Sequence, residues 1–301
     1  MIIINYIINE LEYAKQLIDD SEIDPNPYYA LSLISRYYYH NKGLRKKKIV
    51  DLLGHYMVRH YIIEEYEKSD WMERIEKIAA NAHKYPLKDI KGISIKVPEM
   101  NVIDSISGTA LRRLAFTILC LAKLSNARNK SNNGWVNVNS KDVFELANIS
   151  CSSYEREAKI GALYHKGLLE FPKQNDNLSY RVTFIDDNDN DDESMFIDDL
   201  RALGYQYMNA HGGGFTKCRE CGIMIREKDN PHVPGRKRIY CKNCVAQNQL
   251  GIRVLRCIDC GYMFSTDIKG KKVKRCPYCR SKHNREYHKK YMRERRKNNA
   301  C

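Results

Sequence analysis

In the first third of the chain, apolar residues recur at the three- and four-residue spacing of a helix face. The run from Ile4 to Ile18 shows this spacing most clearly. Three further helices are expected where prolines or a glycine separate similar runs, over Tyr28–His40, Leu44–Tyr61 and Trp71–Tyr85. A short strand is expected at Ile93–Val97. The pattern therefore predicts a helical domain over residues 1–109.

Residues 110–185 contain both helical and extended patterns, unlike the mainly helical first third of the chain. The expected elements are a helix over Leu111–Leu124, a strand over Trp135–Val138, a helix over Ser140–Ala147, a helix ending at Lys166, and strands over Leu168–Phe171 and Tyr180–Ile185. The third helix opens with the capping box Ser152-x-x-Glu155, and Gly167 follows its last residue. This order resembles that of winged helix-turn-helix DNA-binding domains. The resemblance implies that the third helix enters the major groove.

Charge is distributed unevenly along the chain, whose formal net charge is +14. Residues 186–214 hold eight acidic residues and one basic residue, so they are interpreted as an acidic linker, with a short helix expected over Met195–Met208. Residues 215–301 hold 24 basic and seven acidic residues. Because such a positive field attracts polyanions, it favours nucleic acid as the partner.

Eight of the 11 cysteines form four C-x-x-C pairs in the C-terminal third. They predict two four-ligand metal sites. The first consists of Cys218, Cys221, Cys241 and Cys244, and the second of Cys257, Cys260, Cys276 and Cys279. Four thiolates in a two-plus-two spacing are typical of structural zinc, with an iron–sulfur cluster as the alternative. We expect two structural zinc ions in tandem zinc ribbons, over residues 215–250 and 251–280. Ile239, Tyr240 and Val273 suit strands that lead into the second pair of each site.

A basic tail over residues 281–301 follows the last cysteine pair, and we expect it to form a helix along phosphates. In the winged segment, the expected nucleic-acid contacts are Ser153, Arg156 and Lys159 of the third helix and Lys173, Asn175 and Asn177 of the wing. In the ribbons and the tail they are Arg236, Lys237, Arg238, Lys271, Lys272, Lys274, Arg275, Arg285, Lys289, Lys290 and Arg293.

Several classes of protein do not fit the sequence. No apolar run approaches the roughly 18 residues of a membrane span, and the start of the chain lacks the pattern of a signal peptide, so a cytoplasmic protein without a membrane partner is expected. No phosphate-binding loop, paired catalytic carboxylates or nucleophile elbow is found, so neither an enzyme nor a small-molecule substrate is expected. Cys120 lies in an apolar helical run and is expected to be buried.

The whole chain is similar to uncharacterised proteins of phages, prophages and related mobile elements. The segments that show the similarity are the opening residues Ile3–Lys15, residues 132–137, residues 168–173 and the two cysteine clusters. The similarity implies a mainly α architecture with small β elements: a helical domain, a winged helix-turn-helix domain and two zinc ribbons. The expected function is a DNA-binding transcriptional regulator. The alternatives are a zinc-ribbon adaptor on transcription or replication machinery and a structured-RNA-binding protein, with residues 1–109 binding a protein or a second copy.

Overall fold

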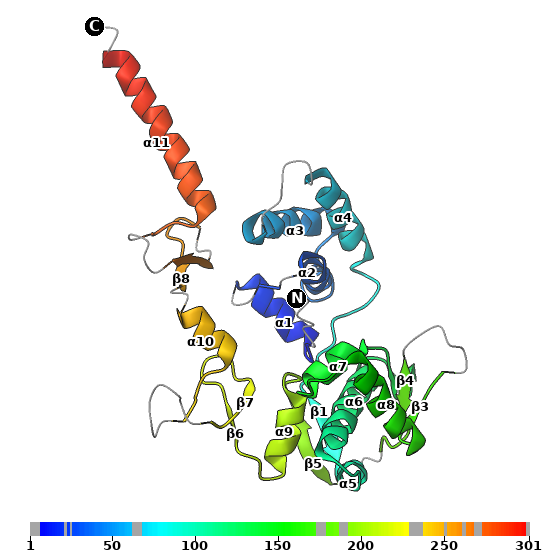
Figure 1. Ribbon diagram of the computed structural model, residues 1–301. Helices are drawn as coiled ribbons and strands as arrows, with labels where there is room; N and C mark the ends of the chain where they lie inside the picture. The colour runs from blue at the N-terminus through cyan, green and yellow to red at the C-terminus, as the bar shows by residue number, and fades with distance from the viewer. Residues whose placement is uncertain are drawn as a thin grey trace. The chain divides into compact units, whose positions relative to one another are not determined.

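The computed structural model describes residues 7–20, 23–24, 26–61, 68–172, 179–186, 192–228, 237–249, 252–260, 263–267 and 273–298. Over these residues the chain is mainly helical, with small antiparallel sheets (Figure 1). The helices are α1 (Glu10–Ile18), α2 (Pro27–His40), α3 (Lys46–His60), α4 (Lys68–Asn81), α5 (Val97–Asp104), α6 (Thr109–Arg128), α7 (Ser140–Leu146), α8 (Ser153–His165), α9 (Leu203–Ala210), α10 (Lys242–Gln249) and α11 (Pro277–Asn298).

The strands are short and pair only as antiparallel ladders. They are β1 (Ile93–Lys96), β2 (Trp135–Val136), β3 (Leu169–Glu170), β4 (Tyr180–Val182), β5 (Glu193–Ile197), β6 (Phe215–Lys217), β7 (Met224–Arg226), β8 (Ile252–Arg256) and β9 (Met263–Asp267). Their pairing orders are β1-β5, β2-β4-β3, β6-β7 and β8-β9. The chain divides into two units, residues 1–13 with 87–241 and residues 14–86 with 242–301.

Three helices of the second unit, α2, α3 and α4, pack on one another. The helix α2 begins where Pro27 follows Asn26, whose side-chain oxygen accepts the Tyr29 N–H at 3.3 Å. Its buried side chains include Leu31 and Ile34. The helices expected in this region are therefore present, with ends that differ from the predictions by a few residues.

The helix α6 lies at the centre of the first unit, in contact with β1, β2 and β4 (Figure 1). All nine side chains from Leu114 to Ala122 are buried, including the thiol of Cys120 as expected. The helix expected over Leu111–Leu124 is thus buried on all sides along this stretch. A helix with other elements on every side has no solvent face, so its apolar pattern is continuous instead of periodic.

The α-helices and strands from α6 to β4 follow the expected order of helix, strand, helix, helix, strand and strand. The hydroxyl of Ser152 accepts the Glu155 N–H at 3.3 Å, and the Glu155 carboxylate accepts the Ser152 N–H at 2.8 Å. Both halves of the predicted capping box are present, and Gly167 has φ +72° just past the end of α8. The helix α7 begins at Ser140 as expected, and the side-chain oxygen of Asn139 caps it by accepting the Lys141 N–H at 2.9 Å.

The segment expected as an acidic linker, residues 186–214, contains both a strand and a helix. Ile197 of β5 pairs with Ile93 of β1, and both side chains are buried in the core that surrounds α6. The helix expected from Met195 begins only at Leu203, because residues 193–197 are extended in this ladder. The expected boundaries at 109/110 and 185/186 therefore do not follow the packing of this core.

The helix α9 packs closely against the turn between α7 and α8. Gly204 lies so near Ala147 that any side chain at this position would collide with the Ala147 carbonyl group. The Tyr205 N–H donates to the side-chain oxygen of Asn148 at 3.2 Å. Asn148 holds a positive φ of 55° in this turn, a conformation that asparagine tolerates better than most residues. The turn between α7 and α8 and the helix α9 are therefore joined at one point by backbone contact.

Candidate metal centres and the C-terminal helix

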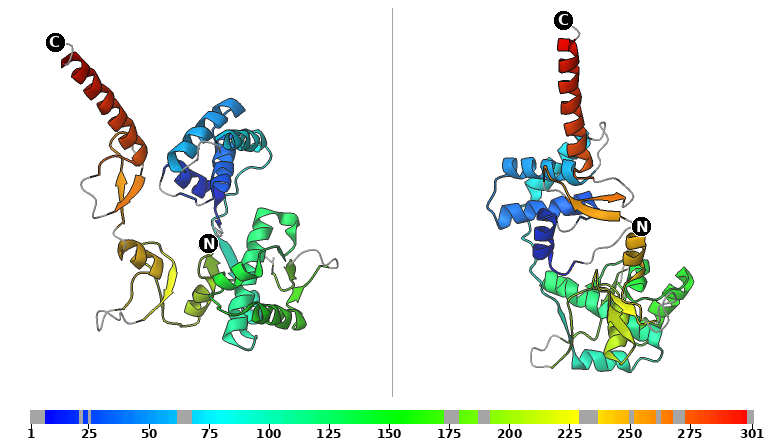
Figure 2. Two further views of the ribbon diagram at one scale, coloured as in Figure 1. Left: turned by 45° about the horizontal axis from the view of Figure 1, so that its top comes forward. Right: turned by 90° about the vertical axis from the view of Figure 1, so that its left-hand side faces the viewer.

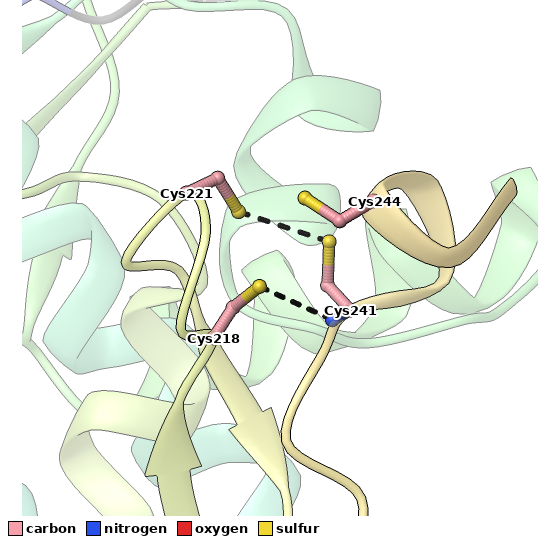
Figure 3. A group of neighbouring side chains, drawn as sticks. All are labelled: Cys218, Cys221, Cys241 and Cys244. Atoms are coloured by element: carbon pink, nitrogen blue, oxygen red, sulfur yellow. Dashed lines mark hydrogen bonds between the residues drawn. The ribbon is translucent and has the colours of Figure 1, made fainter. Parts of the chain in front are cut away.

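The first cysteine cluster starts in the tight loop between β6 and β7. The Cys218 N–H donates to the Ile223 carbonyl and the Gly222 N–H to the Cys218 carbonyl, each at 2.9 Å. Gly222 has φ +74°, a conformation that glycine adopts without strain. The loop therefore closes on itself and holds Cys218 and Cys221 with their thiols on the same side (Figure 3).

The other pair of this cluster lies at the start of α10. Cys241 immediately precedes the helix and Cys244 lies in its first turn. The four sulfur atoms lie within 4.8 Å of one another, and the sulfurs of Cys221 and Cys241 are 3.7 Å apart (Figure 3). That separation is far longer than a disulfide bond of about 2.05 Å. It agrees with the edge of about 3.8 Å of a tetrahedron whose centre lies about 2.3 Å from each sulfur, as in a zinc–thiolate centre.

The second cluster repeats the arrangement. Cys257 and Cys260 lie between β8 and β9, Cys276 immediately precedes α11, and Cys279 lies in the first turn of that helix. The sulfurs of Cys260 and Cys276 are 3.8 Å apart, and Cys257, Cys276 and Cys279 are buried together with the partly buried Val273. Both predicted four-cysteine groups are therefore assembled in the structure, with the four sulfurs of each group within 4.8 Å of one another and able to hold a metal ion.

The prediction of strands before the second pair of each cluster is wrong for both clusters. Ile239 and Tyr240 are not in a strand, nor is Val273, and the ligands that follow them open helices instead. The Cys276 sulfur accepts the Cys279 N–H at 3.5 Å, the contact that an N-cap side chain makes. A helix start suits these ligands because its free N–H groups and positive dipole end stabilise an anionic metal–thiolate centre.

Backbone donors favour the thiolate form of one cysteine in each hairpin. Burial raises the pKa of Cys218, but hydrogen bonds from backbone N–H groups, including that of Cys241 at 3.3 Å, outweigh it and lower the pKa to about 6. The same balance lowers the pKa of Cys257 to about 6. Burial and the neighbouring sulfurs raise the pKa of Cys279. A divalent cation would hold all four sulfurs of a cluster as thiolates, so metal binding there releases protons.

The β6–β7 hairpin, which provides Cys218 and Cys221, is attached to α9. The Arg201 guanidinium donates to the Cys221 carbonyl at 2.8 Å and also pairs with Asp199. The rings of Tyr205 and Phe215 are 4.9 Å apart. Since α9 also packs on α6, the first cysteine pair is connected to the core around α6 through one short helix.

A partly buried acid–histidine contact fixes the end of α9, and the sequence patterns did not predict it. The Asp104 carboxylate accepts the Tyr207 hydroxyl at 2.6 Å and faces Nε2 of His211 at 2.9 Å. The other ring nitrogen of His211 lies 2.9 Å from the Tyr207 carbonyl oxygen. Burial alone would lower the pKa of His211, but these two acceptors raise it. Asp104 and His211 are more than a hundred positions apart, so no local pattern indicates their contact.

The predicted contacts of the third helix are only partly available to nucleic acid. Ser153 is exposed, whereas Lys159 is half-buried and Arg156 turns back to donate to the Cys151 carbonyl at 3.4 Å. Tyr154, which was not among the predicted contacts, is 80% exposed in the first turn of α8. Lys173, Asn175 and Asn177, which were expected in the wing, lie outside the described residues.

The arginines of residues 110–185 are engaged within the protein. Each of the five donates to a protein carbonyl: Arg112 to Ile106, Arg113 to Asn148, Arg128 to Ile7, Arg156 to Cys151 and Arg181 to Asn133. Arg181 also pairs with Glu170. The positive charge of this segment therefore provides fewer free phosphate ligands than its sequence implies.

The predicted contacts of the C-terminal third fall into four groups. Arg236, Lys271 and Lys272 lie outside the described residues, and Lys237 and Arg275 form ion pairs with Glu227 and Asp259. Lys274 is exposed and Arg238 is half-buried. Arg285 is exposed on α11, and Lys289, Lys290 and Arg293 also belong to this helix. The helix expected in the basic tail is thus present and begins within the second cluster.

No family model, curated protein or solved structure matches this chain. The interpretation of its sites therefore rests on their residues and geometry. In the part of the chain that the structure describes, none of the helices is both long enough and apolar enough to span a bilayer.

Proposed function

We propose that this protein is a zinc-stabilised DNA-binding regulator that holds phosphates with α11 and reads duplex DNA with a winged helix-turn-helix domain. The proposal rests on one observation, the length and basic composition of α11. It is a helix of 22 residues with nine Lys/Arg and two Glu, and its first turn is part of the second metal site. Its exposed residues include Arg280, Lys282 and Arg285.

The metal proposed for both clusters is zinc in a structural role. Four thiolates close the coordination shell, so none of the four positions is open to a substrate. The sulfur separations of 3.7 and 3.8 Å suit this ion. The metal would supply no chemistry beyond joining a hairpin to a helix start in each cluster. Folding of residues 215–298 should therefore depend on metal binding.

The winged-helix assignment is supported by the order of elements from α6 to β4 and by the pairing order β2-β4-β3. The helix α8 follows α7 after a short turn, and its first turn carries the exposed residues Ser153 and Tyr154. In helix-turn-helix proteins these first residues of the second helix contact base edges. The observed engagement of the arginines suggests that α8 provides base contacts while α11 provides phosphate contacts.

One observation favours the alternative of an adaptor that binds protein. Tyr164 of α8 and Phe171 after β3 are each 45% exposed, and their rings are 5.0 Å apart. An exposed aromatic pair of this kind is common in protein interfaces. If the winged segment docks on a protein, it should do so through this pair and should not discriminate between DNA sequences.

The metal part of the proposal is tested by measuring the metal content of the full-length protein by mass spectrometry under native conditions. Two zinc ions are expected per chain, and about one in each of the variants Cys241→Ser and Cys276→Ser. The matched control is Cys151→Ser, which removes a half-buried cysteine outside both clusters and should leave two ions. Visible absorption bands of iron, or no loss of metal in either ligand variant, would contradict the assignment.

The DNA part is tested by selecting bound fragments from random duplexes at about 0.15 M salt. A recovered motif that disappears in Ser153→Ala/Tyr154→Ala, but persists in the control Tyr85→Ala, would support base reading by α8. Tyr85 is 71% exposed and belongs to the other unit. Binding without any motif that is insensitive to the α8 variant would favour the adaptor, and preference for structured RNA over duplex would favour the RNA alternative.

A further inference from the structure

The helix α11 has an unusual combination of residues. From Pro277 to Asn298 it contains no Ala, Val, Leu, Ile, Phe or Trp. Among its described side chains, the exposed apolar surface comes from two tyrosines one turn apart, Tyr287 and Tyr291, which are 68% and 50% exposed, and from Met292 at 36%. Figures 1 and 2 show α11 as one unbroken helix. The apolar surface that it offers to a partner is therefore mostly flat aromatic ring.

Basic and amide side chains lie on the same face as the rings. By helical periodicity, the positions of the two tyrosines and of the exposed residues Arg280, Asn284 and His288 fall within about 100° of the helix circumference. Positions 286 and 294, which hold the two glutamates of α11, fall outside this arc. The surface defined by Arg280, Asn284, Tyr287, His288 and Tyr291, here called the tyrosine face, therefore combines ring planes with positive charge.

This chemistry excludes several kinds of occupant. A coiled-coil partner needs apolar residues at regular heptad positions, and α11 has none of the aliphatic residues that normally occupy them. A helix lying on a membrane needs a face of Leu, Phe or Trp, which is also missing. A paired duplex covers the faces of its bases by stacking, so the two rings would gain little from it beyond edge contacts.

Unpaired bases match the tyrosine face on both counts. Each base offers an exposed π-face for stacking on a tyrosine ring, and each nucleotide brings a phosphate that an arginine or a protonated histidine attracts. The two rings are separated by about 6 Å along the helix axis, since four residues rise by that amount. Successive unpaired bases of an extended strand can therefore each reach one ring.

We propose that the tyrosine face of α11 binds a single-stranded segment of nucleic acid, with Tyr287 and Tyr291 stacking on unpaired bases. This inference rests on the proposed function, because it assigns to α11 a preference within nucleic acids. The two proposed sites then have different roles: α8 contacts the edges of paired bases, and α11 contacts unpaired bases.

The test measures binding of the full-length, zinc-loaded protein to fluorescent oligonucleotides of equal length: oligo-dT, oligo-U and a fully paired duplex. The replacement Tyr287→Ala/Tyr291→Ala removes both rings and retains the helix, since alanine is a better helix former than tyrosine. Loss of each stacked ring should weaken binding of a single strand by about 5- to 150-fold, so this double variant should bind it at least about 30-fold more weakly. Duplex affinity should change by less than about twofold, and the salt dependence of single-strand binding should stay the same.

Two matched variants separate ring stacking from charge attraction and from hydrogen bonding by the tyrosine hydroxyls. Tyr287→Phe/Tyr291→Phe keeps the rings and should bind single strands as the unmodified protein does. Arg280→Gln/Arg285→Gln removes two exposed charges and should weaken single strand and duplex alike, with a shallower salt dependence. Comparing oligo-dT with oligo-U shows whether the preferred strand is DNA or RNA.

The outcomes distinguish the two proposals. If the alanine variant weakens single strand and duplex equally, or if the phenylalanine variant is as weak as the alanine variant, stacking on unpaired bases is wrong while nucleic-acid binding stands. If the unmodified protein binds none of the three probes but binds an acidic peptide, the proposed function itself is wrong. A selective loss of single-strand binding in the alanine variant alone establishes the inference.

Discussion

The contact of α9 with the turn between α7 and α8 can be broken by one methyl group. A β-carbon placed on Gly204 would lie 1.9 Å from the Ala147 carbonyl oxygen and 2.5 Å from its carbonyl carbon. Both atoms belong to the backbone of a turn whose next residue, Asn148, is already in a positive-φ conformation. Because these are backbone atoms, the Ala147 carbonyl group cannot rotate away as a side chain would. In Gly204→Ala, α9 must therefore move away from this turn by about an ångström or more.

The magnitude of the effect follows from three contributions. Forcing an extra methyl group into packed surroundings costs about 1–3 kcal/mol. Lengthening the 3.2 Å hydrogen bond from the Tyr205 N–H to Asn148 costs about 1 kcal/mol more. Alanine in place of glycine within a helix stabilises it by about 1 kcal/mol, which offsets the lost hydrogen bond. The net destabilisation of the docked α9 is therefore about 1–3 kcal/mol.

Hydrogen exchange measured by mass spectrometry on peptides covering residues 203–210 can detect this change. A loss of 1–3 kcal/mol in the free energy of local opening should speed exchange in α9 by about 5- to 150-fold. The matched control is Gly161→Ala, since Gly161 also lies in a helix but a β-carbon there meets no atom within 4 Å. It should leave α9 unchanged and slow exchange in α8. Unchanged exchange of α9 in Gly204→Ala would refute the close contact.

Three further predictions concern single interactions. The pKa of His211 is raised above 6.5, so its contact with Asp104 should stabilise the fold fully below that pH and weaken as pH rises through the raised value. In urea titrations, the free energy of unfolding should therefore fall over this pH range, and a His211→Gln variant should lose this pH dependence. Ser152→Ala should destabilise α8 by about 1 kcal/mol, seen as faster exchange in its first turn. Glu99→Ala should lower the free energy of unfolding, measured by thermal unfolding, by about 3–5 kcal/mol, because it leaves the charge of Lys123, whose side chain is 13% exposed, without its partner at 2.7 Å. A loss below about 1 kcal/mol would contradict the burial cost of this charge.

Features encoded within a few neighbouring residues could be predicted from the sequence. The capping box of α8 and Gly167 depend on residues at most four positions apart, and both are present as expected. The same holds for the cysteine pairs, since one tight loop sets the distance between Cys218 and Cys221. That two pairs share one metal site follows from chemistry, because four thiolates and one cation form a closed set.

Long-range pairing could not be predicted in the same way. The strand β5 follows an acidic stretch, and its partner β1 lies about a hundred positions earlier, so no local signal distinguishes this strand from a linker. The second cluster does carry a local signal that favours a helix over the expected strand. Pro277 directly follows Cys276, and proline is favoured at the first position of a helix.

Net charge alone is a poor guide to where this protein would hold nucleic acid. Residues 110–185 have a net positive charge, yet their arginines donate to carbonyl groups such as those of Ile106 and Asn148. The charges of α11 lie on a helix whose start holds two metal ligands. An isolated helix is costly to nucleate, and ligation of Cys276 and Cys279 fixes its first turn. The metal would therefore decide whether the basic residues of α11 form one ordered surface, and the proposed phosphate binding would depend on the metal without any contact between metal and phosphate.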